Sequence, residues 1–206
     1  MTTEPRTLRV VAVSGSLTAP SRTTALVEEI VEAFGRVLPI ESHVIALNTL
    51  GPHLAGALNR KDLPAIAEQE LVSIETADLL VVATPVYRAS FTGLFKHLFD
   101  FVDQYALVDT PVLLAATGGS ERHALIIEHQ LRPLFSFFQS LALPVGVYAH
   151  DSDFTDYRVS NEQLSERIEK AISRALPLVR SSLAERELIE RSLAGEEPVI
   201  DAGAAI

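Results

Sequence analysis

The chain contains no cysteine, no tryptophan and a single methionine among its 206 residues. Without cysteine it has no disulfides, no thiolate metal ligands and no cysteine nucleophile. No apolar run approaches the ~20 residues that a membrane helix requires, and the longest candidate, 77–83, is interrupted by Asp78. The N-terminal stretch MTTEPRTLRV has no basic patch followed by an apolar segment, so we expect no signal peptide and no membrane partner. These absences predict a cytoplasmic protein.

Basic residues are also scarce: the chain has 17 lysines and arginines but 27 acidic side chains, which gives a formal net charge of −10. This average field repels polyanions, so nucleic acid is not an expected partner. Apolar residues make up 48% of the chain, which is enough for a sizeable core. An acidic protein can still bind one phosphate group where a few donors converge.

Several catalytic and nucleotide-binding motifs are missing. The chain has neither G-x-G-x-x-G nor G-x-x-x-x-G-K-[ST], and no G-x-S-x-G elbow. Its six histidines are scattered without an H-x-x-x-H pair, so no metal site is expected. With no evident acid–base group, we expect no catalytic side chain. This suits hydride transfer, in which a cofactor carries the chemistry.

Apolar, mostly β-branched runs alternate with segments of helical periodicity. The predicted strands are 8–14, 41–47, 78–84, 111–117 and 143–149. The predicted helices begin at Ser21 and then cover 63–76, 91–102, 123–141 (with a kink or break at Pro133) and 161–182, while 51–60 reads as a loop.

This alternation predicts an α/β protein with a doubly wound, five-stranded parallel sheet. Five strands fit the flavodoxin-like order 2-1-3-4-5 better than the six-stranded Rossmann order. Residues 1–182 are expected to form a single flavodoxin-like domain, and 183–206 a helical extension with a flexible acidic tail.

Three loops are expected at the carboxyl edge of this sheet, where ligands of such folds bind. The first, 15–24, leads into a helix N-terminus, which suits a phosphate group. The candidates to bind it are Ser14, Ser16, Ser21, Arg22 and Thr23, since hydroxyls and a guanidinium add donors. The alternative is that Ser21 merely caps the helix and the remainder is a polar loop.

The second and third loops, 85–90 and 118–122, could line a flat heterocycle. Pro85, Val86, Tyr87 and Arg88 follow the most apolar strand, and Gly118 and Gly119 allow close approach of the backbone. The alternatives are an ordinary half-buried Tyr87 and a simple strand-to-helix turn at the glycines. Three such loops at one sheet edge outline a slot for a phosphate and a planar ring.

The motifs V-S-G-S, P-S-R-T, A-T-P-V-Y-R-A-S-F-T-G and A-T-G-G-S-E-R-H occur here in order. With their spacing over 8–156, they resemble the NAD(P)H-dependent FMN reductases of two-component monooxygenase systems, especially those serving alkanesulfonate and methanesulfonate monooxygenases. The resemblance implies FMN as cofactor or substrate, NADPH or NADH as hydride donor to flavin N5, and delivery of reduced FMN to a separate monooxygenase. It assigns the FMN phosphate to Ser16, Ser21, Arg22 and Thr23, and the isoalloxazine ring to Pro85, Val86, Tyr87, Arg88, Thr117, Gly118 and Gly119.

The apolar character of 125–138 on nearly all sides suggests a second buried face, hence a homodimer or homotetramer. The resemblance implies that this helix lies at a subunit interface and that His129 influences oligomerisation or flavin release. The alternative is a surface or core histidine without a functional role. Two other functions remain open from the residues: an FMN-bound NAD(P)H quinone or azo reductase, and a flavodoxin-type electron carrier. The sequence decides neither between NADPH and NADH nor on the partner monooxygenase.

Overall fold

The computed structural model describes residues 6–193. The tail expected at 194–206 therefore lies outside the described residues, as do residues 1–5. The strands are β1 (Leu8–Ser14), β2 (Ile40–Ala46), β3 (Leu79–Pro85), β4 (Pro111–Gly118), β5 (Leu141–Ala142), β6 (Val147–His150), β7 (Phe154–Thr155) and β8 (Arg158–Val159). The α-helices are α1 (Arg22–Gly35), α2 (Leu47–Leu54), α3 (Ala65–Glu75), α4 (Gly93–Phe101), α5 (Arg132–Phe137) and α6 (Glu162–Leu193). Short 3-10 helices cover Arg60–Asp62, Glu121–His123 and Asp151–Asp153, and a π-helical turn covers Ile127–Leu131.

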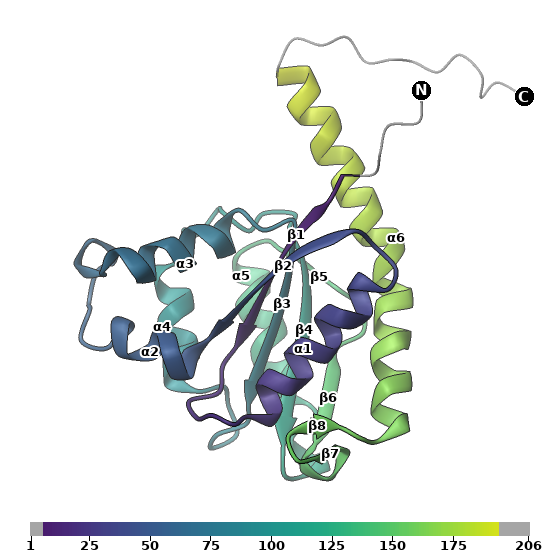
Figure 1. Ribbon diagram of the computed structural model, residues 1–206. Coiled ribbons are helices and arrows are strands. Elements are labelled where there is room, and N and C mark those ends of the chain that lie inside the picture. The colour runs from purple at the N-terminus through teal and green to yellow at the C-terminus, as the bar shows by residue number, and fades with distance from the viewer. Residues whose placement is uncertain (1–5, 194–206) are drawn as a thin grey trace, which may run out of the picture.

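The main sheet is parallel, in the order β2-β1-β3-β4-β5, with β6 also paired to β4. The flavodoxin-like order predicted from the sequence is confirmed. Figure 1 shows helices on both faces of this sheet, with α1 and α6 on one face and α3, α4 and α5 on the other.

Each face of the sheet has its own hydrophobic core, because alternate residues of a strand point to opposite sides. In β1, Val11 and Val13 pack with the helices α2 to α5, whereas Val10 and Ala12 pack with α1 and α6. Strands β3 and β4 are buried almost throughout, as their uninterrupted apolar sequences predict. The sheet is thus a rigid platform whose carboxyl edge can present loops.

Two helices that flank this edge begin with capping side chains. The Ser21 hydroxyl accepts a hydrogen bond of 3.2 Å from the Thr24 N–H at the start of α1. The Thr92 hydroxyl accepts from the Phe95 N–H at the start of α4 and donates to the Gly15 carbonyl at 3.0 Å. The loop after β1 is therefore tied to the loop after β3.

The structure corrects the prediction of a loop at 51–60, because α2 extends through Gly51 and Pro52 to Leu54. Its buried Leu47, Leu50 and Leu54 supply the helical spacing that holds it to the core. The predicted fifth strand, 143–149, is also wrong as a single element. Only 147–149 of this range is strand, as part of β6, while β5 ends at Ala142 and 143–146 belong to no strand. Pro144 cannot donate to the sheet, and Gly146 lies against Ile127.

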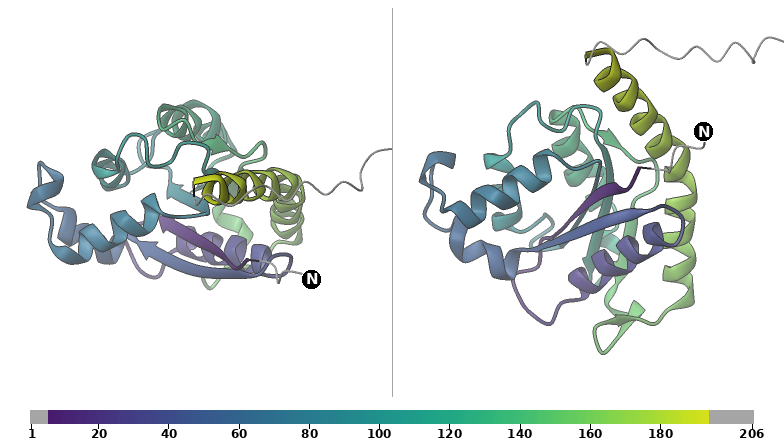
Figure 2. Two further views of the ribbon diagram at one scale, coloured as in Figure 1. Left: turned by 90° about the horizontal axis from the view of Figure 1, so that it is seen from above. Right: turned by 45° about the horizontal axis from the view of Figure 1, so that its top comes forward.

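The helix predicted over 123–141 is divided into a 3-10 turn, a π-helical turn and α5. Pro133 lies in the first turn of α5, directly after the π-helical turn, and Leu131 and Arg132 both keep helical backbone angles, so the helix type changes here and the helix does not end. The hairpin β7–β8 was not predicted, and α6 continues from Glu162 to Leu193. Figure 2 shows the last turns of α6 running past the sheet, at the end opposite the β7–β8 hairpin. Within residues 6–193, no helix is both long and apolar enough to cross a membrane.

Candidate functional site

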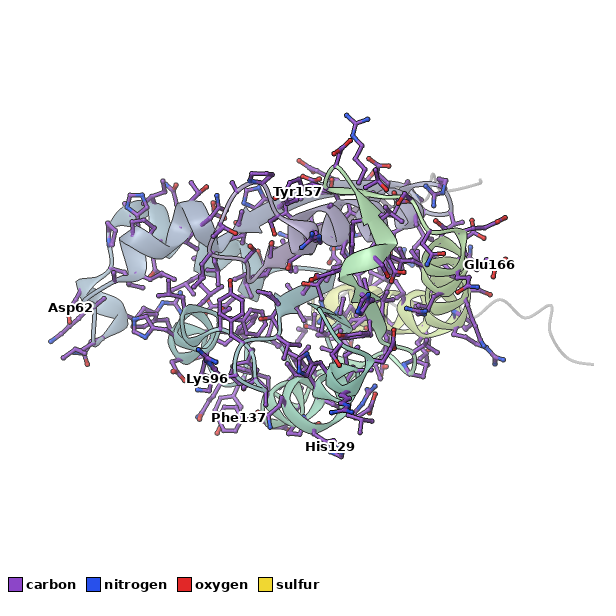
Figure 3. The ribbon with its side chains drawn as sticks, turned by 90° about the horizontal axis from the view of Figure 1, so that it is seen from below. Asp62, Lys96, His129, Phe137, Tyr157 and Glu166 are labelled. Atoms are coloured by element: carbon purple, nitrogen blue, oxygen red, sulfur yellow. The ribbon has the colours of Figure 1, made fainter. Side chains whose placement is uncertain are left out.

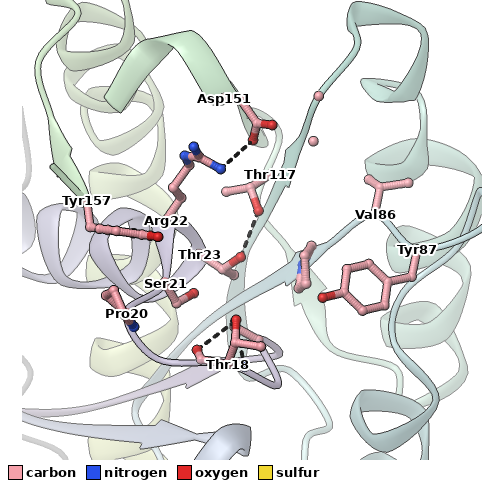
Figure 4. Close-up of a pocket in the computed structure, with 14 residues that line it drawn as sticks. Thr18, Pro20, Ser21, Arg22, Thr23, Val86, Tyr87, Thr117, Asp151 and Tyr157 are labelled. Carbon is pink, nitrogen blue, oxygen red and sulfur yellow. Dashed lines mark hydrogen bonds and ion pairs between the residues drawn. The ribbon is translucent and has the colours of Figure 1, made fainter. Parts of the chain in front are cut away.

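A cavity of about 290 Å³ opens at the carboxyl ends of β1, β3 and β4, in front of the N-terminus of α1 (Figure 4). It is bordered by the three loops singled out in the sequence and by the segment that follows β6. The lining residues are Ser16, Thr18, Pro20, Ser21, Arg22, Thr23, Pro85, Val86, Tyr87, Thr117, Gly118, Gly119, Asp151 and Tyr157.

One end of the cavity is formed by the first turn of α1. The earliest intrahelical hydrogen bond of α1 comes from the Ala25 N–H, and Ser21 accepts from Thr24. The N–H groups of Arg22 and Thr23 have no acceptor within the helix. Together with the positive end of the helix dipole and the Arg22 guanidinium, they form a donor set suited to a phosphate.

The opposite wall is the loop after β3, from Pro85 to Tyr87. The Val86 N–H donates to the Thr117 carbonyl at 2.8 Å, which joins this loop to the end of β4. Tyr87 and Ser90 exchange two backbone hydrogen bonds of 2.9 and 3.1 Å, while Arg88 and Ala89 between them have φ of 51° and 67°. Tyr87 is thereby held at the rim of the cavity, where its side chain is 47% exposed.

Behind the glycine loop after β4 stands Tyr148. Its hydroxyl donates to the Ser120 carbonyl at 2.6 Å, and burial raises the pKa of this phenol, so it stays protonated at neutral pH. A Cβ on Gly118 would lie only 2.6 Å from the Tyr148 oxygen. Glycine is therefore required here by packing from behind, which leaves a flat backbone surface toward the cavity.

The structure brings ten of the twelve predicted FMN-binding residues together around this cavity, all except Ser14 and Arg88. Ser14 is buried, and its hydroxyl lies 2.8 Å from the Thr24 hydroxyl, so it supports the start of α1 from behind. Arg88 lies exposed on the turn between Tyr87 and Ser90 and does not line the cavity.

Sequence reasoning missed the wall formed by the segment after β6. The Asp151 carboxylate lies 3.4 Å from the Arg22 guanidinium, and the Tyr157 ring centroid lies 5.8 Å from the Arg22 guanidinium carbon (Figure 4). Tyr157 is placed by the tight turn of the β7–β8 hairpin, where Asp156 and Tyr157 have φ of 48° and 57°. The sequence signal for this hairpin was Asp156 at the first turn position, but Asp156 is followed by Tyr157 and not by the glycine typical of such turns. Thr18 and Pro20 complete the lining.

Chemically, the lining offers donors, hydroxyls and flat backbone rather than acid–base machinery. Arg22 is the one cation among the lining residues and Asp151 the one carboxylate. No group of three or more potential metal ligands occurs in the part of the chain that the structure describes. A phosphate site at one end and a flat slot at the other suit the two ends of FMN.

Comparison with known proteins gives the same assignment. The family model described as "NADPH-dependent FMN reductase" matches residues 8–155. The chain is 57% identical to the NADH-dependent FMN reductase SfnF of Pseudomonas fluorescens, over 86% of this chain and 95% of that protein. It is 55% identical to an NADPH-using FMN reductase of Pseudomonas aeruginosa, over 82% and 91% of the two chains.

Among solved structures, an oxidoreductase from Corynebacterium diphtheriae superposes with a TM-score of 0.76 and 33% identity, over 85% of this chain and 98% of that one. The region matched by the family model, 8–155, contains every predicted FMN-binding residue. This chain belongs to the NADPH-dependent FMN reductase family.

Proposed function

We propose that this chain is an NAD(P)H:FMN oxidoreductase that uses the described cavity for FMN and supplies reduced FMN to a separate monooxygenase. The observation that carries the proposal is the convergence of three sheet-edge loops on one cavity, with a helix N-terminus and Arg22 at one end. The two Pseudomonas relatives named above are FMN reductases, one described as NADH-dependent and the other as using NADPH.

In this proposal the residues of the chain bind and orient, while bound FMN supplies the redox chemistry by accepting hydride. Arg22, Ser21 and Thr23 hold the phosphate through charge-assisted hydrogen bonds. Val86 and Tyr87 border the ring on one side, and the Gly118–Gly119 backbone borders it on another. No single side chain is indispensable, so substitutions produce graded losses.

The decisive experiment is anaerobic oxidation of NADPH and NADH by purified apo-protein, titrated with free FMN and separately with a quinone. Saturation with free FMN and recovery of reduced FMN in the flow-through would support a flavin supplier. Retention of flavin with turnover sustained only by the quinone would assign the chain to quinone or azo reduction. Failure to oxidise either nicotinamide would leave only an electron carrier.

Arg22→Ala tests the site itself. We expect FMN affinity to fall about ten- to a hundredfold, as for loss of a hydrogen bond to a charged group. Riboflavin, which lacks the phosphate, should bind nearly as before, and turnover at saturating FMN should change little. A thousandfold fall in that turnover would show that Arg22 has another role.

We also propose that a second copy of the chain covers the outer face of the π-helical turn and α5. Phe137 in α5 and Leu125 just before the π-helical turn are 64% and 61% exposed, and His129 lies exposed between them in sequence. Figure 3 shows His129 and Phe137 on the side of the molecule opposite Tyr157. Phe137→Glu should shift the mass measured by light scattering toward the monomer. Leu58→Glu, at an 87% exposed position elsewhere, is the control.

A further inference from the structure

The charged groups of the cavity form a single opposed pair. Among the residues that line it, only Arg22 carries positive charge and only Asp151 negative charge. Their side chains are 45% and 47% exposed, and the nearest nitrogen and oxygen are 3.4 Å apart. The guanidinium available to a phosphate is therefore already opposite a carboxylate of the same chain.

The backbone around Asp151 is fixed by its neighbours. The His150 N–H donates to the Asp153 carboxylate at 2.8 Å, and the Asn161 side-chain amide donates to the same carboxylate at 2.6 Å. Asp153 is buried and thus holds the turn together. The Asp151 carboxylate accepts none of these bonds and points to the neighbouring Arg22 guanidinium (Figure 4).

The position of the Asp151 carboxylate is also limited by the glycine loop. A Cβ on Gly119 would lie 3.2 Å from the second carboxylate oxygen of Asp151, so this group rests against the loop. The Arg22 guanidinium, which Asp151 faces, also lies over the Tyr157 ring. Asp151 thus stands between the phosphate end of the cavity and the loop proposed to border the ring.

We infer that Asp151 competes with the FMN phosphate for Arg22 and thereby sets how readily FMN leaves. The inference rests on the proposed FMN site. A half-exposed ion pair contributes little to stability, so an incoming phosphate can exchange with it. Once the phosphate is bound, the nearby carboxylate opposes its charge. Such opposition weakens binding mainly by speeding dissociation, which suits a protein that must deliver its flavin.

The test compares Asp151→Asn with the unaltered protein in binding FMN and riboflavin, followed by quenching of flavin fluorescence. We expect FMN to bind about three- to tenfold more tightly to the variant, with slower release in stopped-flow. Riboflavin affinity should not change, because it carries no phosphate. The increase in FMN affinity should be smaller at an ionic strength of about 0.5 M, because salt screens the charges there.

Asp156→Asn is the matched control, since it removes one negative charge in the nearby hairpin from a residue outside the cavity lining. An equal gain in that variant would overturn the inference, because net charge alone would explain it. Unchanged or weaker FMN binding by Asp151→Asn would also overturn it. Equal weakening of FMN and riboflavin would instead show that Asp151 accepts hydrogen bonds from the flavin side chain. If the unaltered protein binds neither flavin, the proposed function itself fails. Thermal unfolding of the ligand-free variants verifies that each is folded.

Discussion

The Thr23 hydroxyl on α1 lies 2.7 Å from the Thr117 hydroxyl at the end of β4, and both side chains are buried. This bond joins residues that are 94 positions apart in the chain. It fixes the helix N-terminus against the strand from which the glycine loop departs. This pair of hydroxyls therefore adds to the backbone and side-chain bonds that join the loops around the candidate site.

Replacing either partner should cost stability. Thr117→Val leaves the buried Thr23 hydroxyl without a partner, so we expect the free energy of unfolding to fall by about 1–3 kcal/mol. The double variant with Thr23→Val should lose less than the sum of the two single variants, because no orphaned hydroxyl remains. Urea unfolding of all four proteins measures this, and strictly additive losses would contradict the pairing.

Gly118→Ala should disturb the wall of the site from behind. The new methyl group would lie 2.6 Å from the Tyr148 hydroxyl oxygen and force that ring away. We expect a loss of about 1–3 kcal/mol, as for other overpacked sites, together with weaker FMN binding. Tyr148→Phe removes the obstructing oxygen, so the double variant should recover part of the loss. Absence of any recovery would place the strain elsewhere.

Gly146→Ala should destabilise the sheet edge. A Cβ there would meet the Ile127 side chain at 2.6 Å and the Leu114 carbonyl oxygen at 3.1 Å. A stiff β-branched side chain and a backbone atom cannot move aside cheaply, and we expect a loss of about 1–3 kcal/mol. Gly93→Ala is the control, because nothing lies within 4 Å of its Cβ position. Gly93→Ala should leave the free energy of unfolding unchanged or raise it by up to about 1 kcal/mol. Urea unfolding midpoints measure both variants.

Arg60 should make stability depend on pH. Its guanidinium donates to Glu68 at 2.7 Å and to Glu75 at 2.9 Å, and the bonds to Glu68 lower the pKa of that carboxyl below its usual 4.5. Since the folded-state pKa is the lower one, this stabilisation is complete above the unfolded value and is lost as the pH falls through the folded value.

Arg60→Met should therefore destabilise the protein by about 1–3 kcal/mol at pH 7, where Glu75 is left without its cation. The difference from the unaltered protein should narrow as the pH falls below 4.5. Arg36→Met is the control, because the Arg36–Glu29 pair is 3.8 Å apart and Arg36 is 52% exposed. A difference for Arg60 that stays constant from pH 7 to about pH 3 would argue against ionic stabilisation.

The parallel sheet was predictable because its central strands contribute side chains to the hydrophobic cores on both faces. β3 and β4 are continuous apolar runs between helices, and this pattern has few other solutions. α2 was not predicted because Gly51 and Pro52 are usually found in turns, although they fit a short helix anchored by three buried leucines. The split of the fifth strand depends on Gly146 meeting Ile127, a contact between distant positions that local patterns do not contain.

The candidate site was predictable as far as its loops follow buried strands. Ser14 lies outside the cavity lining, and its position at the end of β1 does not reveal that its hydroxyl turns toward Thr24. Asp151 and Tyr157 were missed because they belong to a 3-10 turn and a hairpin of two-residue strands, too short for any periodicity. Their approach to Arg22 is decided by tertiary packing.

The cavity draws its lining from widely separated places in the chain, from Ser16 to Tyr157. During synthesis, a nascent chain that ends before Pro111 carries the helix N-terminus and the loop after β3 but lacks the rest of the wall. Flavin can stabilise only a conformation that binds it. For the proposed FMN site, cofactor supply therefore cannot guide the early steps of folding in the cell, and acts only on a chain synthesised at least as far as Tyr157.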